Sequence, residues 1–457
     1  MLDINNLYSY QKKIVNFLCS RKKCCIWAGC GLGKSISILT GIKFLLDKGK
    51  IKSALIVAPP NVVENVWKQE AEKWEHTKDL KISLVIGNEK QRIKALEEEA
   101  DVYCLSRDLL YWLFQYDKYK FQFLCLDESS GFKDKKSRRF ASLMQRSINT
   151  GGKKYYRKEP MISMFKYVCE LTGTPASESY AGLWSQLQII SYGGINPLGK
   201  SLTSFREEYM IPQIFNGFPV YTKMKEGAME KINQKLDESG MCISMRTEDY
   251  IELPEKIEIV RYITMKDKRY DEMKKNSVVT VDKTTSVIAN SALDKINKTQ
   301  QICSGFLYDE FGNAHTLNHD KEKALEEILE ALDNEPVLIL YRYEYEKDVL
   351  KKIGGIPLDN PKALNDWNKG RIKIGLLYPS NAYGLNIQQV CSVIIWYTQS
   401  LSGEQTEQAV KRIWRQGQTK NVRIFYLIFR NTVDEMVYNL IKNKKDVLDE
   451  LLKHFSV

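Results

Sequence analysis

The chain has 457 residues, 43% of them hydrophobic and 27% charged, which is typical of a globular protein of two or three domains and excludes a disordered or fibrous chain. The 68 lysine and arginine residues outnumber the 57 aspartate and glutamate residues, and the formal charge of +11 suits a polyanionic partner without requiring one. The sequence shows no signal peptide and no apolar run of 18 residues, and its ten scattered cysteines are typical of reduced thiols, so we expect a cytoplasmic protein with no membrane partner.

An amphipathic helix is predicted over residues 7–18. It carries Gln11, whose amide has both a donor and an acceptor and can therefore read the edge of an adenine; a surface glutamine is the alternative. Four neighbouring cysteines suggest a metal site, namely Cys19, Cys24, Cys25 and Cys30. Because three of them fall in or beside the first predicted strand, whose side chains alternate between its two faces, burial as small apolar residues is the favoured interpretation.

The stretch Trp27–Ser35 follows a short apolar run and leads into a segment with helical apolar spacing, residues 36–46. Strand, glycine-rich turn and helix are the context that a phosphate-binding loop needs, because glycines let several backbone N–H groups point into one concavity at a helix N-terminus. Lys34 would reach the β- and γ-phosphates, and Ser35 would hold Mg²⁺. The strict pattern has glycine where Ala28 stands, and an ordinary glycine-rich turn is the alternative.

Strands and helices alternate through the first half of the chain. The run at residues 54–58 is apolar throughout and is followed by prolines, as expected of a buried parallel strand. Repeated strand–helix units predict a doubly wound parallel α/β sheet, in which ligands bind at the carboxyl ends of the strands. Further strands are predicted at residues 82–86, 102–105, 121–126 and 167–171, and helices at residues 62–74, 91–99 and 108–114.

Asp127 and Glu128 stand at the carboxyl end of the strand predicted at residues 121–126. Two adjacent acids are unfavourable in a core and in a turn, but beside a bound nucleotide both have a use. Asp127 would hold Mg²⁺ through water, and Glu128 would orient and deprotonate the attacking water. The pair therefore turns a phosphate-binding loop into a candidate hydrolysis site.

A basic segment follows, with ten basic residues and one acidic residue between Gly131 and Lys158. Within it, glycine, charge and paired tyrosines predict a loop over residues 149–160. One interpretation is a solvated surface loop. The other is a DNA-contacting loop, with cations on phosphates and a tyrosine stacked on or wedged against a base. The cations are Lys153, Lys154, Arg157 and Lys158, and the tyrosines are Tyr155 and Tyr156.

Residues 191–255 are turn-rich at both ends and are predicted as an irregular, partly helical insertion or connector. We expect one domain at residues 1–190 and another at residues 256–457. The second domain repeats the strand–helix alternation, with strands predicted at residues 336–341, 372–378, 393–396 and 422–428.

A helix is predicted at residues 408–418, near the end of the chain. It would carry Gln408, Arg412 and Arg415 on one face, at positions i, i+4 and i+7. Two arginines placed in this way can neutralise charge on a transferring phosphoryl group. A basic surface helix has the same spacing, but the terminal Gln-Gly-Gln is hard to explain on that interpretation.

These features stand in the order of the motifs of superfamily 2 helicases and translocases, and the chain resembles the SNF2-like branch of that superfamily. The resemblance rests on Gln11 (motif Q), Gly31–Ser35 (motif I), Asp127-Glu128 (motif II), Leu171–Pro175 (motif III), Val337–Arg342 (motif IV), Pro379–Asn386 (motif V) and Gln408–Gln418 (motif VI). Trp367–Gly370 looks like the compact phage and bacterial members. Two segments depart from the pattern: Ser129-Ser130 replaces the usual final pair of motif II, and Tyr397–Gly403 stands where many relatives carry Trp-Asn-Pro.

The resemblance implies two RecA-like parallel-sheet lobes that bind ATP and Mg²⁺ between them, with DNA crossing both lobes. The implied nucleotide-binding residues are Gln11, Gly29, Gly31, Gly33, Lys34, Ser35, Asp127, Gly384 and Gln408, with the metal on Ser35 and Asp127 and catalysis by Lys34, Glu128, Arg412 and Arg415. The motifs and the basic segment supply the candidate DNA contacts: Pro60, Asn61, Ser106, Arg107, Lys135, Arg138, Lys153, Lys154, Tyr155, Tyr156, Arg342 and Ser380.

Three functions are compatible with this resemblance. The first is a DNA-dependent ATPase that unwinds or migrates forked or branched DNA, alongside replication or recombination proteins and, for a phage protein, in the host cytoplasm. The second is a duplex translocase that strips or remodels bound protein without separating strands. The third, a nucleic-acid-binding scaffold clamped by ATP, is disfavoured because Glu128 and both arginines are present.

Overall fold

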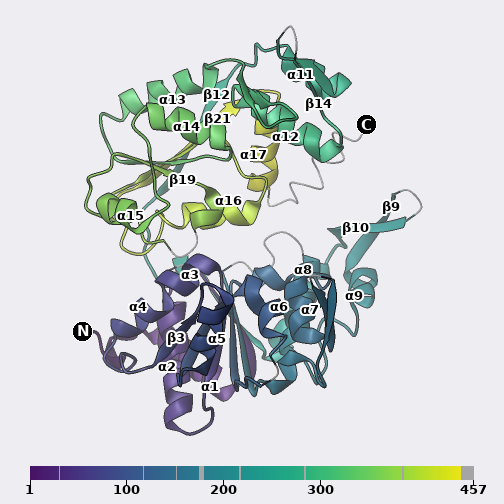
Figure 1. Cartoon of the computed structure of the whole chain (residues 1–457), viewed down its shortest axis with the longest axis vertical. Helices are drawn as coiled ribbons and strands as arrows, with labels where there is room; N and C mark the ends of the chain where they lie inside the picture. Colours follow the sequence, from purple (N-terminus) through teal and green to yellow (C-terminus); the bar gives the residue numbers. More distant parts are fainter. Residues whose placement is uncertain are drawn as a thin grey trace. The chain divides into compact units, whose positions relative to one another are not determined.

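The computed structural model describes the whole chain except residues 30, 117, 151, 174–179, 216–217, 283–284, 383–384 and 444–457. The chain forms two compact units, Met1–Ile251 and Glu252–Val457, each built around a parallel sheet (Figure 1). The fold class predicted from the sequence, two parallel-sheet α/β lobes, is confirmed. Among the helices of the described ranges, none combines the length and the apolar character needed to cross a membrane.

Unit 1 contains a seven-stranded sheet in which each strand is parallel to its neighbours. Its spatial order is β11 (Cys242–Met245), β1 (Lys23–Ala28), β8 (Tyr167–Thr172), β5 (Phe123–Asp127), β2 (Ala54–Ala58), β4 (Val102–Ser106) and β3 (Ile82–Val85). Strands β2, β4, β5 and β8 are buried at every position, as expected of strands inside a parallel sheet.

The helices of unit 1 connect these strands. They are η1 (Ile4–Asn6), α1 (Ser9–Ser20), α2 (Lys34–Asp47), α3 (Pro60–Asn65), α4 (Trp67–Glu72), α5 (Glu89–Glu97), η2 (Arg107–Leu109), α6 (Leu110–Leu113), η3 (Ser129–Phe132), α7 (Arg138–Met144), η4 (Met161–Met164), α8 (Tyr180–Ile190), α9 (Leu202–Tyr209), α10 (Ala228–Ser239) and η5 (Thr247–Asp249). Helices α5 to α10 share one apolar cluster with one face of the sheet, whereas α1 packs on α2, and α2 on α4. The helix predicted at residues 62–74 is two helices, because Val66 (φ −117°) interrupts it.

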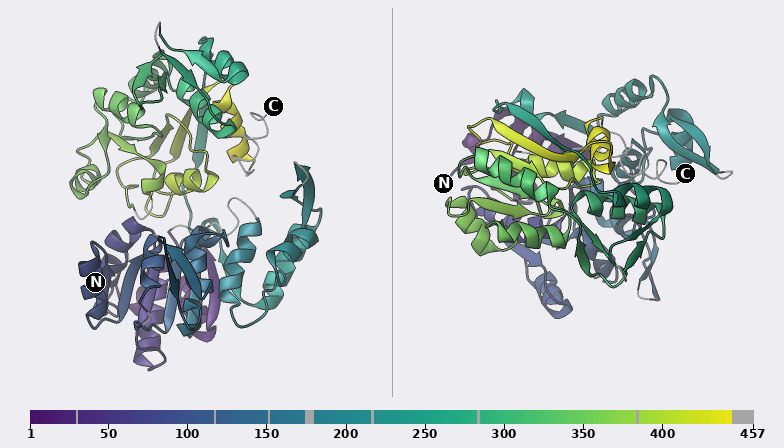
Figure 2. Two further views of the ribbon diagram at one scale, coloured as in Figure 1. Left: turned by 45° about the vertical axis from the view of Figure 1, so that its right-hand side comes forward. Right: turned by 90° about the horizontal axis from the view of Figure 1, so that it is seen from above.

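Two antiparallel hairpins extend unit 1. The first, β6 (Ser147–Thr150) with β7 (Lys153–Tyr156), occupies residues predicted as a loop, so that prediction was wrong. The second is β9 (Met210–Phe215) with β10 (Phe218–Met224), which projects beyond α9 away from the sheet (Figure 1 and, from another side, Figure 2). The segment 191–255 therefore holds regular elements, and its strand β11 pairs with β1.

Unit 2 contains a six-stranded parallel sheet in the order β12 (Lys256–Ile263), β21 (Val422–Phe429), β20 (Val393–Trp396), β17 (Val337–Leu340), β19 (Ile374–Leu377) and β18 (Ile356–Pro357). Alternate residues of its strands enter two different apolar clusters. One cluster includes α15 (Pro361–Asn368) and α16 (Gly403–Val410), and the other includes α13 (Asp320–Ala331) and α14 (Glu344–Lys352), so helices cover both faces.

Most of the remaining elements of unit 2 contribute to a third apolar cluster beside the sheet. They are α11 (Arg269–Asn276), β13 (Val278–Thr280), β14 (Ser286–Ile288), α12 (Ala292–Cys303), β15 (Phe306–Tyr308), β16 (Ala314–Thr316), α17 (Val433–Lys442) and, between β19 and β20, the turn η6 (Pro379–Ala382). Of these, η6 packs on α16 rather than in the third cluster.

Candidate functional site

The carboxyl ends of the strands of unit 1 lie along one edge of its sheet, because all seven strands are parallel. The predicted site residues of this half stand directly after those ends. The glycine-rich loop follows β1, Pro60 and Asn61 follow β2, Arg107 follows β4, and Asp127 ends β5. The topology therefore gathers at one edge residues as far apart in the sequence as Gly29 and Asp127.

The glycine-rich loop is held in place by Gln11. Gly33 caps the N-terminus of α2 in the left-handed conformation (φ +68°), and a Cβ on it would lie 2.1 Å from Gln11 Nε2. The Gln11 amide donates from Nε2 to the Leu32 carbonyl at 3.4 Å, and its Oε1 accepts from the Tyr8 N–H at 2.9 Å. Only glycine leaves room for this contact, so Gln11 ties α1 to the loop and is not a surface glutamine.

The ammonium group of Lys34 folds back onto the loop. Its Nζ donates to the Ala28 carbonyl at 2.7 Å and to the Gly29 carbonyl at 3.2 Å. These bonds place a cation inside the turn, at the N-terminus of α2, where backbone N–H groups already favour an anion. Ser35, the next residue, is half-buried in the first turn of α2.

The sequence analysis missed Thr247, which packs on the same loop from a position more than 200 residues later. Its Oγ1 would lie 2.1 Å from a Cβ at Gly29, and the Gly29 N–H donates to the Met245 carbonyl at 3.0 Å. Both contacts depend on β11 pairing with β1. No local pattern signals this pairing, because β11 (Cys-Ile-Ser-Met) is short and only partly apolar.

The acid pair lies where β5 ends. Asp127 and Glu128 are 8% and 7% exposed, and the Glu128 N–H donates to Asp127 Oδ1 at 3.1 Å. Glu128 adopts the left-handed conformation (φ 52°, ψ 61°), which costs a non-glycine residue of the order of 1 kcal/mol or more. Such strain is common at active sites, where the surrounding structure enforces it.

The cysteines near the loop behave as buried apolar residues. Cys24 and Cys25 are fully buried in β1, and burial raises the pKa of Cys104 and Cys125 on neighbouring strands. Cys30 lies outside the described residues. Within the ranges that the structure describes, no three His, Cys, Asp or Glu side chains are grouped to hold a metal ion.

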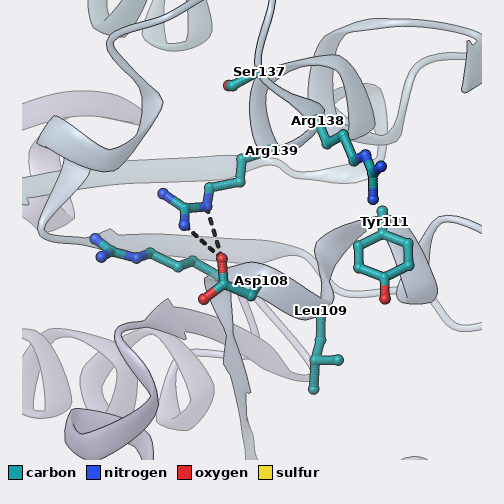
Figure 3. Close-up of a pocket in the computed structure, with 7 residues that line it drawn as sticks. Asp108, Leu109, Tyr111, Ser137, Arg138 and Arg139 are labelled. Carbon is teal, nitrogen blue, oxygen red and sulfur yellow. Dashed lines mark hydrogen bonds and ion pairs between the residues drawn. The ribbon is translucent and has the colours of Figure 1, made fainter. Parts of the chain in front are cut away.

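A basic pocket of about 420 Å³ lies beside this edge (Figure 3). Arg139 donates from Nε and Nη2 to Asp108 Oδ1 at 3.0 and 2.5 Å, and the exposed Arg138 lies over the Tyr111 ring at 6.0 Å (Figure 3). The lining residues are Arg107, Asp108, Leu109, Tyr111, Ser137, Arg138 and Arg139. Three arginines against one aspartate make this pocket a candidate for binding phosphate, and Arg139 and Asp108 are additions to the predicted set.

Other predicted DNA contacts of unit 1 differ in exposure. Lys135 and Pro60 are exposed and Asn61 is half-buried, whereas Ser106 is buried and its hydroxyl accepts from the Asp108 N–H at 3.4 Å. The Ser106 side chain therefore caps η2 instead of facing solvent.

The β6–β7 hairpin presents its cations unevenly. Lys153 and Lys154 are exposed, Tyr156 is 70% exposed with the Lys154 ammonium 5.2 Å from its ring centre, and Tyr155 is half-buried. Arg157 is only 8% exposed and donates to the Phe114 carbonyl at 3.1 Å. The prediction that Arg157 contacts phosphate was therefore wrong, because its guanidinium anchors the hairpin to the core.

The sheet of unit 2 brings Arg342 and Ser380 to one edge, after β17 and β19. Arg342 is half-buried, and its Nη2 donates to Asn297 Oδ1 at 2.9 Å. The Ser380 hydroxyl donates to Asn381 Oδ1 at 3.4 Å. Gly384 lies outside the described residues.

The segment of motif VI is helical only at its start, so the predicted helix at residues 408–418 was wrong beyond Val410. Helix α16 ends there and turns follow, with Gly417 left-handed (φ 91°). Arg412 nonetheless stays beside Gln408, donating from Nη2 to its Oε1 at 3.0 Å. Arg415 instead donates from Nη1 to Asn386 Oδ1 at 2.8 Å.

The terminal Gln-Gly-Gln has a structural role. Gln418 Nε2 donates to the Cys391 carbonyl at 2.8 Å and to the Gln388 carbonyl at 3.1 Å. These bonds tie the turns after α16 to the segment before β20, which fixes the backbone that carries both arginines.

Comparison with known proteins gives a consistent result. Residues 10–306 match the SNF2-related domain family. Protein p41 of Acyrthosiphon pisum secondary endosymbiont phage 1 is 28% identical over 463 residues, covering 97% of this chain and 97% of that protein. The uncharacterized ATP-dependent helicase MG018 of Mycoplasma genitalium is 24% identical and covers 98% of this chain. The DNA repair and recombination protein RAD54B of Gallus gallus is 23% identical and covers 93% of this chain.

The chain is much shorter than the last two relatives, since it spans 42% of MG018 and 52% of RAD54B. Among solved structures, the Sulfolobus solfataricus SWI2/SNF2 ATPase core in complex with dsDNA aligns with 98% of this chain and 97% of that one, at 18% identity and a TM-score of 0.44.

Proposed function

This chain belongs to the SNF2-related domain family and has the ATPase core of that family, and on this premise we propose that it couples ATP hydrolysis to movement on DNA, with unwinding or branch migration of forked or branched DNA as its work. The observation that carries the proposal is the edge of the sheet in unit 1. There the loop with Lys34 follows β1, and the acids Asp127 and Glu128 stand at the end of β5 in the same parallel sheet.

The residues of this edge fit ATP and Mg²⁺. Gln11 closes on the turn between β1 and α2 so tightly that a Cβ at Gly33 would lie 2.1 Å from its Nε2, and Lys34 supplies a cation inside the turn. We propose that Gly31 and Gly33 bind phosphate through their N–H groups, and that Ser35 and Asp127 hold Mg²⁺, which supplies charge neutralisation at the phosphates. Gly29, whose N–H is bonded to the Met245 carbonyl, is assigned to the loop for the close approach of Thr247 that only glycine permits. Glu128 is the proposed base for the attacking water.

The residues of unit 2 are proposed to complete hydrolysis. Arg412 and Arg415 are cations carried by one short segment, held by Gln408 and Asn386. Arginines of this kind stabilise the charge on a transferring phosphoryl group. We assign Gln408 and Gly384 to the nucleotide by resemblance, and we expect Arg412→Ala and Arg415→Ala to lower kcat more than ATP binding.

DNA is proposed to run over cationic groups of both units, with phosphate contacts that fix position and not sequence. In unit 1 the support comes from the arginine pocket and from the exposed cations of the β6–β7 hairpin. In unit 2 the candidates are Arg342 and Ser380. Tyr156, which is largely exposed beside Lys154, is the candidate for stacking on a base.

The test of this proposal is the stimulation of ATP hydrolysis by a panel of DNA structures. Single-stranded, duplex, forked and four-way DNA of equal nucleotide content would be compared, each with a strand-displacement or junction-migration assay. We expect forked or four-way DNA to stimulate most and to be remodelled. Absence of stimulation by every DNA would refute the motor function.

A duplex translocase that displaces bound protein is the second candidate. It is favoured if duplex DNA stimulates hydrolysis fully and no strand is displaced. A triplex-displacement assay separates the two, because a translocase removes the third strand from duplex DNA without unwinding the duplex.

A further inference from the structure

The turn that follows the acid pair is tied to a distant helix through a buried side chain. Ser129 is fully buried in η3, and its Oγ donates to Gln186 Oε1 on α8 at 2.8 Å. Gln186 is itself almost fully buried, and its Nε2 donates to the Gly182 carbonyl one turn earlier at 3.4 Å. This second bond orients the amide so that its oxygen faces Ser129.

A third buried group lies beside this pair. Glu170 is fully buried in β8, between Cys25 of β1 and Leu126 of β5 in the sheet register. Its Oε2 is 4.0 Å from Cys25 Sγ, and its Oε1 has no hydrogen-bond partner among the described residues. Burial raises the pKa of Glu170 well above its usual range. Burial thus favours the protonated carboxyl over the carboxylate.

The hydrogen bonds of these groups are complementary. A serine hydroxyl has one proton and two lone pairs, and Ser129 gives its proton to Gln186. A lone pair of Ser129 is thus available to a donor, and the protonated form of Glu170, which burial favours, has a proton to donate. We propose that Glu170, Ser129 and Gln186 form a buried hydrogen-bonded chain that holds Glu128 in its productive conformation and links it to α8.

The strained backbone of Glu128 indicates what this hydrogen-bonded chain stabilises. A left-handed glutamate persists only where its surroundings enforce the conformation, and the residue that follows it is Ser129. Glu170 lies on β8, before the segment of motif III, and Gln186 lies on α8, after it, so the proposed bonds would tie both flanks of that segment to the turn that carries Glu128. Helix α8 also packs on η3 and on α9. A shift of α8 therefore reaches the proposed base directly.

This inference rests on the proposed function, because it assumes that Glu128 acts in hydrolysis. It also explains how a motif II that ends in Ser129-Ser130 works without the usual coupling side chain: the hydroxyl of Ser129 takes a partner on α8 in its place. Ser129, Gln186 and Glu170 are positioning residues, since none of them needs to touch ATP.

The test is steady-state ATP hydrolysis with saturating DNA, comparing variants of the full chain. For Ser129→Ala and Gln186→Leu we expect kcat to fall about tenfold, the equivalent of one lost buried hydrogen bond, with KM for ATP and DNA affinity unchanged within about twofold. Glu170→Gln keeps a neutral donor and should retain activity, whereas Glu170→Leu should lose it to the same extent as Ser129→Ala.

The matched control is Ser185→Ala. Ser185 is also fully buried on α8, but its hydroxyl has no hydrogen-bond partner in the described part of the chain, so its loss should leave kcat unchanged. Melting temperatures check that every variant is folded, and Ser129→Ala with Gln186→Leu still decide the matter if Glu170→Leu does not fold. The double variant Ser129→Ala/Gln186→Leu should be no slower than either single variant.

Two results would overturn the inference: a kcat within twofold of the unchanged protein for both Ser129→Ala and Gln186→Leu, or a rise in KM at constant kcat. A parallel Glu128→Gln variant separates this failure from that of the proposed function. If Glu128→Gln abolishes turnover but the variants of Ser129, Gln186 and Glu170 do not lower kcat, only the proposed hydrogen-bonded chain is wrong. If Glu128→Gln keeps turnover, the assignment of the base is wrong.

Discussion

The exposed lysines of the β6–β7 hairpin allow a quantitative prediction for DNA binding. We expect the double variant Lys153→Ala/Lys154→Ala to lose two phosphate contacts, because both ammonium groups are exposed and neither has an ion-pair partner among the described residues. Each lost contact lowers the slope of log affinity against log salt by about 0.9, so the slope should fall by about 1.8. Between 50 and 200 mM salt, the fall in affinity should then be about 12-fold smaller than for the unchanged protein.

The assay is fluorescence anisotropy of labelled duplex and forked DNA at four or more salt concentrations, without nucleotide. Arg146→Ala is the control, because Arg146 lies at the base of the same hairpin but is paired with Glu159 at 3.1 Å. We expect its slope to stay within experimental error of the original. Arg157 must be left intact, since its loss would detach the hairpin from the core. An unchanged slope in the double lysine variant would show that the hairpin does not contact DNA.

Three further substitutions test the rest of the molecule. Lys34→Ala should abolish ATP turnover while DNA affinity stays within about twofold, measured by phosphate release and anisotropy; substantial turnover would contradict the role given to this cation. Gly33→Ala should lower the free energy of unfolding by about 1–2 kcal/mol because of the left-handed backbone, and further because of the clash with Gln11, so that the melting temperature falls. Adding Gln11→Ala should restore only the stability that the clash removes. Lys321→Met should destabilise unit 2 by about 3–5 kcal/mol in chemical denaturation, because it leaves the buried Asp434, 3.0 Å from the Lys321 ammonium, without its counter-charge; a loss below 1 kcal/mol would contradict this.

The parallel sheets could be predicted from the sequence because their strands are buried on both faces. β2 and β17 are apolar at every position, and a strand of that kind needs no alternation to be recognised. Short, partly polar strands gave no such signal. The sequence analysis does not identify β11 for this reason, and it predicts a loop at β6 and β7 because their segment is rich in charge and glycine.

The positions of the proposed nucleotide-binding residues in unit 1 followed from the rule that ligands bind at the carboxyl ends of parallel strands. The positions of the groups that support these residues do not follow from this rule. Thr247 reaches the loop from a strand paired at the edge of the sheet, and Gln186 reaches Ser129 across 57 positions. Such contacts depend on tertiary packing and leave no periodic pattern. The helix of motif VI was overextended for a related reason, since Gln418 bonds carbonyls near β20 instead of continuing the helix.

The contact of Thr247 with the phosphate loop has a mechanical consequence for the end of unit 1. The Thr247 carbonyl accepts from the Ile251 N–H at 2.9 Å, and Ile251 is the last residue of the unit. Tyr250, beside it, packs on the Tyr10 ring at 5.0 Å, one residue before Gln11 on α1. The last turn of unit 1 is thus bonded to both elements that enclose the proposed ATP site. Thr247 thus lies between the phosphate loop and the end of unit 1, and a side chain at Gly29 would displace it, since a Cβ there would lie 2.1 Å from its Oγ1.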